Sequence, residues 1–229
     1  MPALWVSAPE AIRRASLKVT QLRVAIDIGF RVPRFIVTND VDDAREFLRS
    51  CQSGVVVKAL ALPAILAEDR AAAIFTHLVT ENDLTNIDSV RFGPTLLQEF
   101  VEKRMDVRVT VIGDELFAVG IEPTHREEAR VDFRRVDAFA LPHTVLTLPA
   151  SIHTLCLDLV RRFDLMFGAI DLLLTPDGEY VFLEINPNGQ WLWLEWATGV
   201  PLTHALCDLL TGASQERGIH HCRSGFVVS

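Results

Sequence analysis

The sequence predicts an α+β fold with two lobes. The opening of the chain alternates helical and strand patterns, whereas the second half is rich in antiparallel hairpin patterns, and this order is typical of α+β folds. A length of 229 residues, with 49% hydrophobic and 23% charged residues, is sufficient for a sizeable core. The length alone allows one large domain or two small lobes, and the order of the elements favours two lobes.

The opening predicts two helices and two strands. Apolar residues recur at helical spacing over residues 8–29, which end in a glycine, so a single amphipathic helix is expected there. A short strand follows at 31–38, and the capping chemistry of Asn39 and Asp40 begins a second helix that runs to about Arg49. Residues 55–58 are a β-branched strand that ends in a lysine.

The remaining elements are predicted from periodicity and turn residues. Residues 59–73 contain no glycine, so a helix of low mobility is one interpretation of this stretch, and the Arg-rich stretch 122–136 is expected to be a loop with strand fragments. The other expected elements are a strand at 75–79, a hairpin of 107–111 with 115–120, a helix at 150–167, a hairpin at 167–185 and a closing helix at 201–210.

The 167–185 hairpin carries the strongest functional signal. Asp171 interrupts an apolar strand, and Glu184 interrupts the strand after the Pro-Asp-Gly turn. Buried carboxylates are costly unless they are paired or bound to a cation. Asn186 lies two residues beyond Glu184 and so on the same face of a strand. Simple ion pairing is the alternative, but this oxygen-rich set favours a Mg²⁺ site.

Bulk properties argue against several classes of protein. With 22 basic and 30 acidic residues the net charge is −8, which disfavours a general nucleic-acid surface. The chain has neither an apolar run of membrane-spanning length nor a secretory signal pattern. The four scattered cysteines are expected to be reduced in a cytoplasmic protein. The tail at 216–229, with His220, His221 and Cys222, is expected to be flexible rather than metal-binding.

Over residues 5–212 the chain resembles the ATP-grasp superfamily, and within it the ribosomal-peptide maturases of the graspetide or microviridin type, with the RimK-like ligases more distant. The matching pieces follow the family order: Lys18 with Q-L at 21–22, G-F-R-V-P at 29–33, V-T-N-D at 37–40, V-V-V-K at 55–58, L-Q-E-F-V-E-K at 97–103, D-V-R-V-T-V-I-G-D-E-L-F-A at 106–118, and D…E-I-N-P-N-G-Q-W at 171–191. The continuation with Trp191, Trp193 and Trp196 is similar to the peptide maturases.

The resemblance implies ATP and Mg²⁺ as cofactors, with the nucleotide between the lobes. Lys18 and Lys58 would contact phosphates, and Asp106 would hold the ribose hydroxyls. Adenine would lie against the segment between the lobes, which is Gln98, Glu99, Phe100 and Val101. The metal ligands would be Asp171, Glu184 and Asn186. Arg108 and Arg134 would stabilise the transferred phosphoryl group or the acyl phosphate, because guanidinium suits tetrahedral anions.

Each of these roles has a plainer alternative. Lys58 could be a snorkelling lysine at a strand end, and Lys18 an ordinary surface lysine. Phe100 and Val101 could be core residues, and Arg134 could belong to a solvated loop. The three tryptophans could form a substrate wall, although packing in the core is the more common role.

The expected domains are a first ATP-grasp subdomain at 1–96, a second subdomain with the Mg·ATP site at 97–215, and the tail. We expect two departures from the family. The stretch 59–73, where a flexible loop usually covers the phosphates, has no glycine, and the N-terminal lobe that usually precedes the first helix is expected to be missing.

The resemblance implies an ATP-dependent carboxylate ligase that acts through an acyl phosphate and joins side chains of a ribosomal precursor peptide by ester or amide bonds. The alternatives are a RimK-like amino-acid or peptide ligase and a non-catalytic, nucleotide-binding remnant. The expected partner is a precursor peptide, with no nucleic acid and no membrane, and the resemblance leaves a homodimer open.

Overall fold

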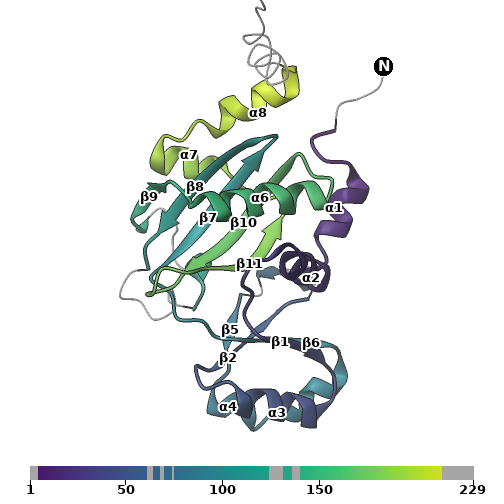
Figure 1. Cartoon of the computed structure of the whole chain (residues 1–229). Helices are drawn as coiled ribbons and strands as arrows, with labels where there is room; N and C mark the ends of the chain where they lie inside the picture. Colours follow the sequence, from purple (N-terminus) through teal and green to yellow (C-terminus); the bar gives the residue numbers. More distant parts are fainter. Residues whose placement is uncertain are drawn as a thin grey trace, which may run out of the picture.

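The structure, a computed structural model, describes residues 5–60, 64–67, 70–73, 75–123, 131–135 and 140–212, and only the backbone of 64–73. A four-stranded and a five-stranded antiparallel sheet lie in two lobes, and helices cover both (Figure 1). The predicted two-lobed α+β fold is confirmed.

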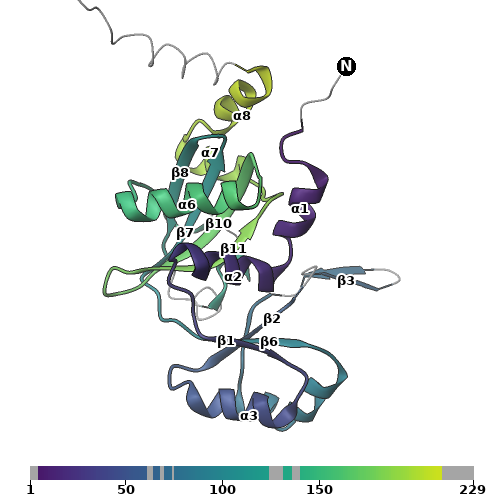
Figure 2. The same ribbon diagram turned by 45° about the vertical axis from the view of Figure 1, so that its right-hand side comes forward.

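The small lobe is built on a sheet with the strand order β1-β6-β2-β5. These strands are β1 (Phe35–Thr38), β6 (Thr95–Glu99), β2 (Val55–Lys58) and β5 (His77–Leu78). The short helices α3 (Val41–Ser50), α4 (Glu81–Leu84) and η1 (Ile87–Phe92) lie along one side of it (Figure 1). The separate hairpin of β3 (Ala64–Ala67) and β4 (Arg70–Ala73) projects beyond the lobe, as Figure 2 shows.

The large lobe is built on a sheet with the strand order β11-β10-β7-β8-β9. These strands are β11 (Tyr180–Asn186), β10 (Phe167–Leu174), β7 (Met105–Ile112), β8 (Glu115–Ile121) and β9 (His143–Leu146). The helices α1 (Pro9–Ala15), α2 (Lys18–Ile28) and α6 (Ala150–Arg162) contribute to the main core, whereas α7 (Leu192–Thr198) and α8 (Leu202–Thr211) form a second cluster with the other side of the sheet. The one-turn helix η2 (Phe133–Arg135) follows β8 along the chain.

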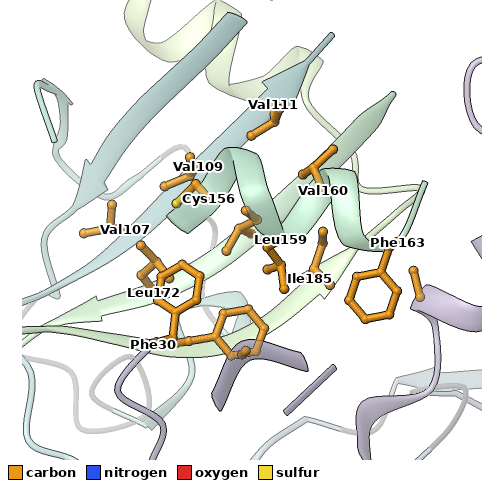
Figure 3. Packing of buried hydrophobic residues seen from close by; sticks show 14 of the residues in the cluster. Phe30, Val107, Val109, Val111, Cys156, Leu159, Val160, Phe163, Leu172 and Ile185 are labelled. Carbon is orange, nitrogen blue, oxygen red and sulfur yellow. The ribbon is translucent and has the colours of Figure 1, made fainter. Parts of the chain in front are cut away.

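The side chains of strand β7 alternate between the main core and the opposite side of the large sheet. Its valines Val107, Val109 and Val111 are buried beneath α6 in the main core (Figure 3). Because side chains alternate along a strand, the residues between them, Asp106, Arg108 and Thr110, face the other way. Strand β7 therefore contributes apolar residues to the core on one face and a row of polar residues on the other.

Most of the predicted elements are confirmed. Asp40 caps α3, since its Oδ1 accepts hydrogen bonds from the amides of Asp42 at 2.8 Å and Asp43 at 3.1 Å. Strands β7 and β8 form the first predicted hairpin, and β10 and β11 form the second. The strand expected at 75–79 contains only two residues, His77 and Leu78. Strand β9 and helix α7 were not predicted.

The single helix expected at 8–29 was wrong, because α1 and α2 are separate helices. The Ser16 hydroxyl donates to the carbonyl of Ile12 at 2.8 Å, a local bond that competes with helix continuation. Leu17 is then extended, with φ −83° and ψ 105°. This break lets α2 begin at Lys18 in a new direction.

The helical interpretation of 59–73 was wrong for the described residues 64–67 and 70–73, whose backbone forms the β3–β4 hairpin. The predicted tail at 216–229 lies outside the described residues, as do 124–130 within the predicted loop. The proposed domain boundaries remain a prediction. Among the described residues, no helix combines the length and apolar character needed to cross a bilayer.

Candidate active site

Three charged residues lie side by side across neighbouring strands of the large sheet. Arg108 of β7 is the register partner of Asp171 of β10, and Asp171 is the partner of Glu184 of β11. The register shifts just after Asp171, since Leu172 pairs with Phe182, which leaves Leu183 as an extra residue. This bulge lets Phe182 and Ile185 both reach the core while Leu183 and Glu184 line a cavity.

Glu184 is surrounded by cations. Its Oε2 accepts from Lys18 Nζ and its Oε1 accepts from Arg134 Nη1 at 3.2 Å. Burial alone would raise the pKa of this carboxyl, but Lys18, Arg134 and Lys58 outweigh that effect and lower the pKa to about 2. Glu184 is therefore an anion at any physiological pH.

Arg108 is held in place beneath Asp171. Its Nη1 donates to Asp171 Oδ1 at 2.7 Å, and its Nη2 donates to the carbonyl of Gln190 at 3.5 Å. The backbone of Gly189 passes so close that an added Cβ would lie 2.7 Å from Arg108 Nη2. The loop after β11 therefore restricts the position of the Arg108 guanidinium.

Helix η2 brings Arg134 to the same place. The carboxylate of Asp132 accepts two hydrogen bonds of 2.8 Å from this arginine, from Arg134 Nε to Oδ1 and from Nη2 to Oδ2. Burial opposes ionisation of Asp132, but the hydrogen bonds from Arg134 outweigh it and lower the pKa of Asp132. The segment also bonds to the small lobe, because Thr76 N donates to Asp132 at 3.2 Å and Arg135 Nη2 donates to Thr76 O at 2.8 Å.

Lys58 and Gln98 face the large lobe from the sheet of the small lobe. Leu97 packs in the small-lobe core beneath α3, so its neighbours in β6, Leu96 and Gln98, point the opposite way. Lys58 is the register partner of Leu96 and shares that face. Burial lowers the pKa of Lys58 to about 8, an effect that Glu184 partly offsets.

The segment after β6 joins the two lobes and supplies backbone groups. The amide of Glu99 donates to Arg34 O at 2.8 Å, and the amide of Phe100 donates to Gly54 O at 2.9 Å. The amide of Val101 has no backbone acceptor among the described residues. Beyond it, Lys103 Nζ lies 2.6 Å from Asp106 Oδ2 in a buried ion pair. Burial raises the pKa of Asp106 to about 6, and Lys103 limits this rise.

These side chains line two adjoining cavities. The first cavity, between the lobes, includes nine of the predicted residues: Lys58, Gln98, Glu99, Phe100, Val101, Asp106, Arg134, Asp171 and Glu184. The second cavity opens beside α1 and α2 and includes Lys18, Lys58, Arg134, Glu184 and Asn186. Lys58, Arg134 and Glu184 thus line both. Arg108 lines neither cavity, because it lies behind Asp171.

The predicted metal ligands are only partly brought together. Asp171 and Glu184 line the first cavity as cross-strand partners, whose Cβ atoms are typically about 5 Å apart. Asn186 lines the second cavity, and its Oδ1 accepts from the amide of Asn188 at 2.9 Å. Among the described residues no group of three His, Cys, Asp or Glu side chains gathers as a metal site. The oxygen donors still fit a hard divalent cation, held by two carboxylates.

Sequence reasoning missed several residues that hold the site. Asp132 orients Arg134, Lys103 pairs with Asp106, and Gly189 allows the close approach to Arg108. Asp171 and Glu184 could be recognised from the sequence because each is an acidic residue within an apolar strand. Asp132 follows a polar stretch, where an acidic residue is not unusual, so no sequence signal singled it out. Of the tryptophans, Trp193 packs against Phe133, with ring centroids 6.4 Å apart, and Trp196 is 70% exposed.

Comparison with known proteins adds independent evidence. The chain is 30% identical to the macrocyclase MdnC from Microcystis aeruginosa, solved with its precursor peptide MdnA (TM-score 0.79; 91% of this chain and 65% of that chain). It is 30% identical to a RiPP-associated ATP-grasp ligase of Chryseobacterium gregarium, solved with ADP and a leader and core peptide (TM-score 0.83; 91% and 63%). It is 24% identical to a probable alpha-L-glutamate ligase of Histophilus somni over 84% of this chain.

The chain spans about two thirds of these relatives' length or less, with 62% of the glutamate ligase and 63% and 65% of the two solved chains covered. A family model described as the RimK-like ATP-grasp domain matches residues 15–210, which include both sheets and every predicted site residue that lines the two cavities. The chain therefore belongs to the RimK-like ATP-grasp family.

Proposed function

We propose that this chain is an ATP-dependent carboxylate ligase that activates a carboxylate of a peptide. One observation carries the proposal: a single cavity between the lobes collects a buried lysine, an inter-lobe backbone segment and two adjacent carboxylates. A Mg·ATP site can use these three features for the phosphates, the base and a metal ion respectively.

The first cavity offers a place for each part of the nucleotide. The base would lie against the inter-lobe segment, where the Val101 amide is available as a donor and the Phe100 and Val101 side chains provide apolar contact. Asp106 would accept from the ribose hydroxyls. The phosphates would extend toward Lys58, with Lys18 and Arg134 beyond it. Lys58 makes a suitable phosphate ligand because its ammonium is poorly solvated.

Asp171 and Glu184 would hold Mg²⁺ between them, with Asn186 as a third oxygen ligand after a change of side-chain position. When bound, the ion would neutralise phosphate charge and polarise the phosphoryl group. Lys18 and Arg134 now neutralise Glu184, so a metal ion on this carboxylate would free both cations to contact anionic groups.

The proposed reaction has two steps. A substrate carboxylate oxygen attacks the γ-phosphorus of ATP, and the bond to the β-phosphate oxygen breaks to give ADP and an acyl phosphate. A hydroxyl or amine then attacks the acyl carbon, loses its proton and expels phosphate, which leaves an ester or amide. Arg134 lies where it could stabilise the transferred phosphoryl group. Because Arg108 lines neither cavity, we propose that it acts through Asp171 as a positioning residue and does not contact the phosphoryl group directly.

A peptide substrate is supported by the relatives. MdnC is a macrocyclase solved with a precursor peptide, and the Chryseobacterium ligase was solved with a leader and core peptide. Similarity to the probable glutamate ligase keeps a RimK-like amino-acid ligase as the second candidate. We propose the peptide substrate because both solved relatives are 30% identical, against 24% for the glutamate ligase.

ADP release and product mass test this proposal together. The full chain would be incubated with Mg·ATP and a synthetic peptide that carries Asp, Glu, Ser, Thr and Lys, with free glutamate in a parallel reaction. We expect ADP release that depends on the peptide and products that have lost one water per bond. Release with glutamate alone would favour the second candidate, and ATP binding without ADP release under any condition would contradict a ligase.

A further inference from the structure

The indole of Trp193 contacts two parts of the candidate active site. Its ring packs against Phe133 of η2, with the two ring centroids 6.4 Å apart. Its Nε1 donates to the carbonyl of Gln190 at 3.2 Å, and the same carbonyl accepts from Arg108. Trp193 lines neither cavity, so any effect of this side chain on the chemistry must pass through these neighbours.

Trp193 covers a small apolar cluster from the side of α7. The buried members of this cluster are Ile121, Phe133 and Leu141. His143, the register partner of Ile121, meets the Trp193 ring edge-on, with centroids 5.6 Å apart. Both ring pairs lie within the roughly 4.5–7 Å that aromatic pairs prefer. Because Trp193 also packs against the cluster of α7 and α8, its ring links η2 to the body of the large lobe.

The segment Asp132–Arg135 contacts both lobes. Its two hydrogen bonds to Thr76 are made with the small lobe, whereas Glu184 lies on the sheet of the large lobe. On the large-lobe side, Phe133 is buried and Arg134 pairs with Glu184 at 3.2 Å. The Arg134 side chain is 41% exposed, so water competes for this ion pair. The apolar contact of Phe133 is therefore the more durable link between this segment and the large lobe.

Ordinary core packing is the alternative role for Trp193. Phe117 of β8 provides the comparison, because it is also a half-buried aromatic residue that packs against the cluster of α7 and α8. Within the described part of the chain, Phe117 does not belong to the cluster of Phe133. If both rings only fill space, both affect stability alone, whereas a role in the site predicts that only Trp193 affects Arg134.

We propose that Trp193 is a positioning residue for Arg134. Its ring holds Phe133, and Phe133 in turn holds η2 so that the Arg134 guanidinium remains beside Glu184. The hydrogen bond from the indole to Gln190 O keeps the ring in its orientation. This inference rests on the proposed function only for what Arg134 does to the phosphoryl group, and it adds a residue outside both cavities that sets the place of Arg134.

The NMR spectrum of the arginine side chains in the full chain tests this placement directly. Because Arg134 Nε donates to Asp132 Oδ1 at 2.8 Å, its N–H should give a signal that disappears in Arg134→Lys. We expect Trp193→Leu to shift or remove this signal, and Trp193→Phe, which retains an aromatic ring, to preserve it. The matched control Phe117→Leu should preserve it as well. An unchanged signal in Trp193→Leu, or an equal change in Phe117→Leu, would overturn the proposal.

Turnover separates positioning from a loss of stability. In folded Trp193→Leu we expect kcat for peptide-dependent ADP release to fall about tenfold or more, because a displaced group at the reacting atoms is costly. The Kd of Mg·AMPPNP should change by less than about threefold, since Arg134 is proposed to act on the transferred phosphoryl group. Trp193→Phe should restore most of the turnover. If Trp193→Leu does not fold, Phe133→Leu removes the same contact from its other side, and unchanged turnover in the folded variant would overturn the proposal.

Failure of this inference can be separated from failure of the proposed function. If ADP is released but neither the Arg134 signal nor the turnover responds to Trp193→Leu, Trp193 only packs and the ligase survives. If the Arg134 signal depends on Trp193 but the chain releases no ADP under any condition, the placement of Arg134 stands and the ligase is wrong.

Discussion

Gln98 has a buried side-chain amide whose nitrogen finds no partner. The residue is 1% exposed, and its Nε2 makes no hydrogen bond in the described part of the chain. A buried donor left in this state costs about 1–3 kcal/mol, so native proteins rarely keep one without a use. Because Gln98 lines the first cavity, a ligand atom is the natural acceptor.

Adenine carries such an acceptor at N7. If Gln98 Nε2 donates to N7, the chain should bind 7-deaza-ATP, which lacks this nitrogen, about three- to tenfold more weakly than ATP, as expected for one hydrogen bond. Gln98→Leu should bind both nucleotides with equal affinity. Calorimetric titration of both proteins with both nucleotides measures the coupling between Gln98 and N7. If Gln98→Leu still binds ATP more tightly than 7-deaza-ATP, another group contacts N7.

At the scale of elements, the loop that joins β11 to α7 controls the position of Arg108. A Cβ at Gly189 would lie 2.5 Å from the Cβ of Ala169 and 2.7 Å from Arg108 Nη2, both too close for any real contact. The loop and strand β10 therefore approach each other only because residue 189 has no side chain.

We expect Gly189→Ala to lower the free energy of unfolding by about 1–3 kcal/mol, the usual cost of overpacking, and to displace Arg108. Gly93→Ala is the matched control, since nothing lies within 4 Å of its added Cβ and its φ of 179° suits any residue. It should change stability by less than about 0.5 kcal/mol. Urea unfolding of the two variants checks this, and equal losses would show that crowding at Gly189 is relieved without cost.

Elements whose cause lies in a short, recognisable stretch of sequence could be predicted, and features without such a signal could not. Asp40, the alternating pattern of β7 and the apolar run of β10 before its Pro-Asp-Gly turn are local signals, so α3 and both hairpins could be predicted. Asp171 and Glu184 stood out as acids in apolar strands. The bulge at Leu183 and the place of Arg108 behind Asp171 depend on contacts between distant segments, which one sequence does not display. The break at Ser16 has a local cause, but the apolar spacing continues through it and hides it.

At the scale of the whole molecule, the lobes meet closely around the first cavity. The cavity encloses about 60 Å³, below the roughly 300 Å³ at which small-molecule sites begin. The two hydrogen bonds between Thr76 and the segment Asp132–Arg135 hold the lobes together at its edge. Entry of a nucleotide therefore requires the lobes, or the side chains at the cavity mouth, to move apart.

The buried Asp106–Lys103 pair gives the whole molecule a measurable pH dependence. Because burial raises the pKa of Asp106 from its usual value near 4 to about 6, the folded state holds its proton more tightly than the unfolded state. This contribution to stability is complete below pH 4 and is lost as the pH rises through 6. By linkage it amounts to roughly 3 kcal/mol.

Asp106→Asn removes the titration and leaves the charge on Lys103 constant over this range. We therefore expect the unfolding free energy of the unmodified chain to fall relative to that of Asp106→Asn between pH 4 and 7, as measured by urea unfolding at intervals of pH. A constant difference, or one with the opposite slope, would show that Asp106 does not titrate in this window.

The central proposal is that Asp171 and Glu184 together bind Mg²⁺ and, through it, the triphosphate of ATP. Its most direct test is calorimetric titration of ATP into the chain with and without Mg²⁺, repeated for Asp171→Asn and Glu184→Gln. We predict one ATP site whose affinity requires Mg²⁺, and loss of that Mg²⁺ dependence in both variants while circular dichroism shows an intact fold. ATP binding that is equally tight without Mg²⁺, or in both variants, would contradict the account.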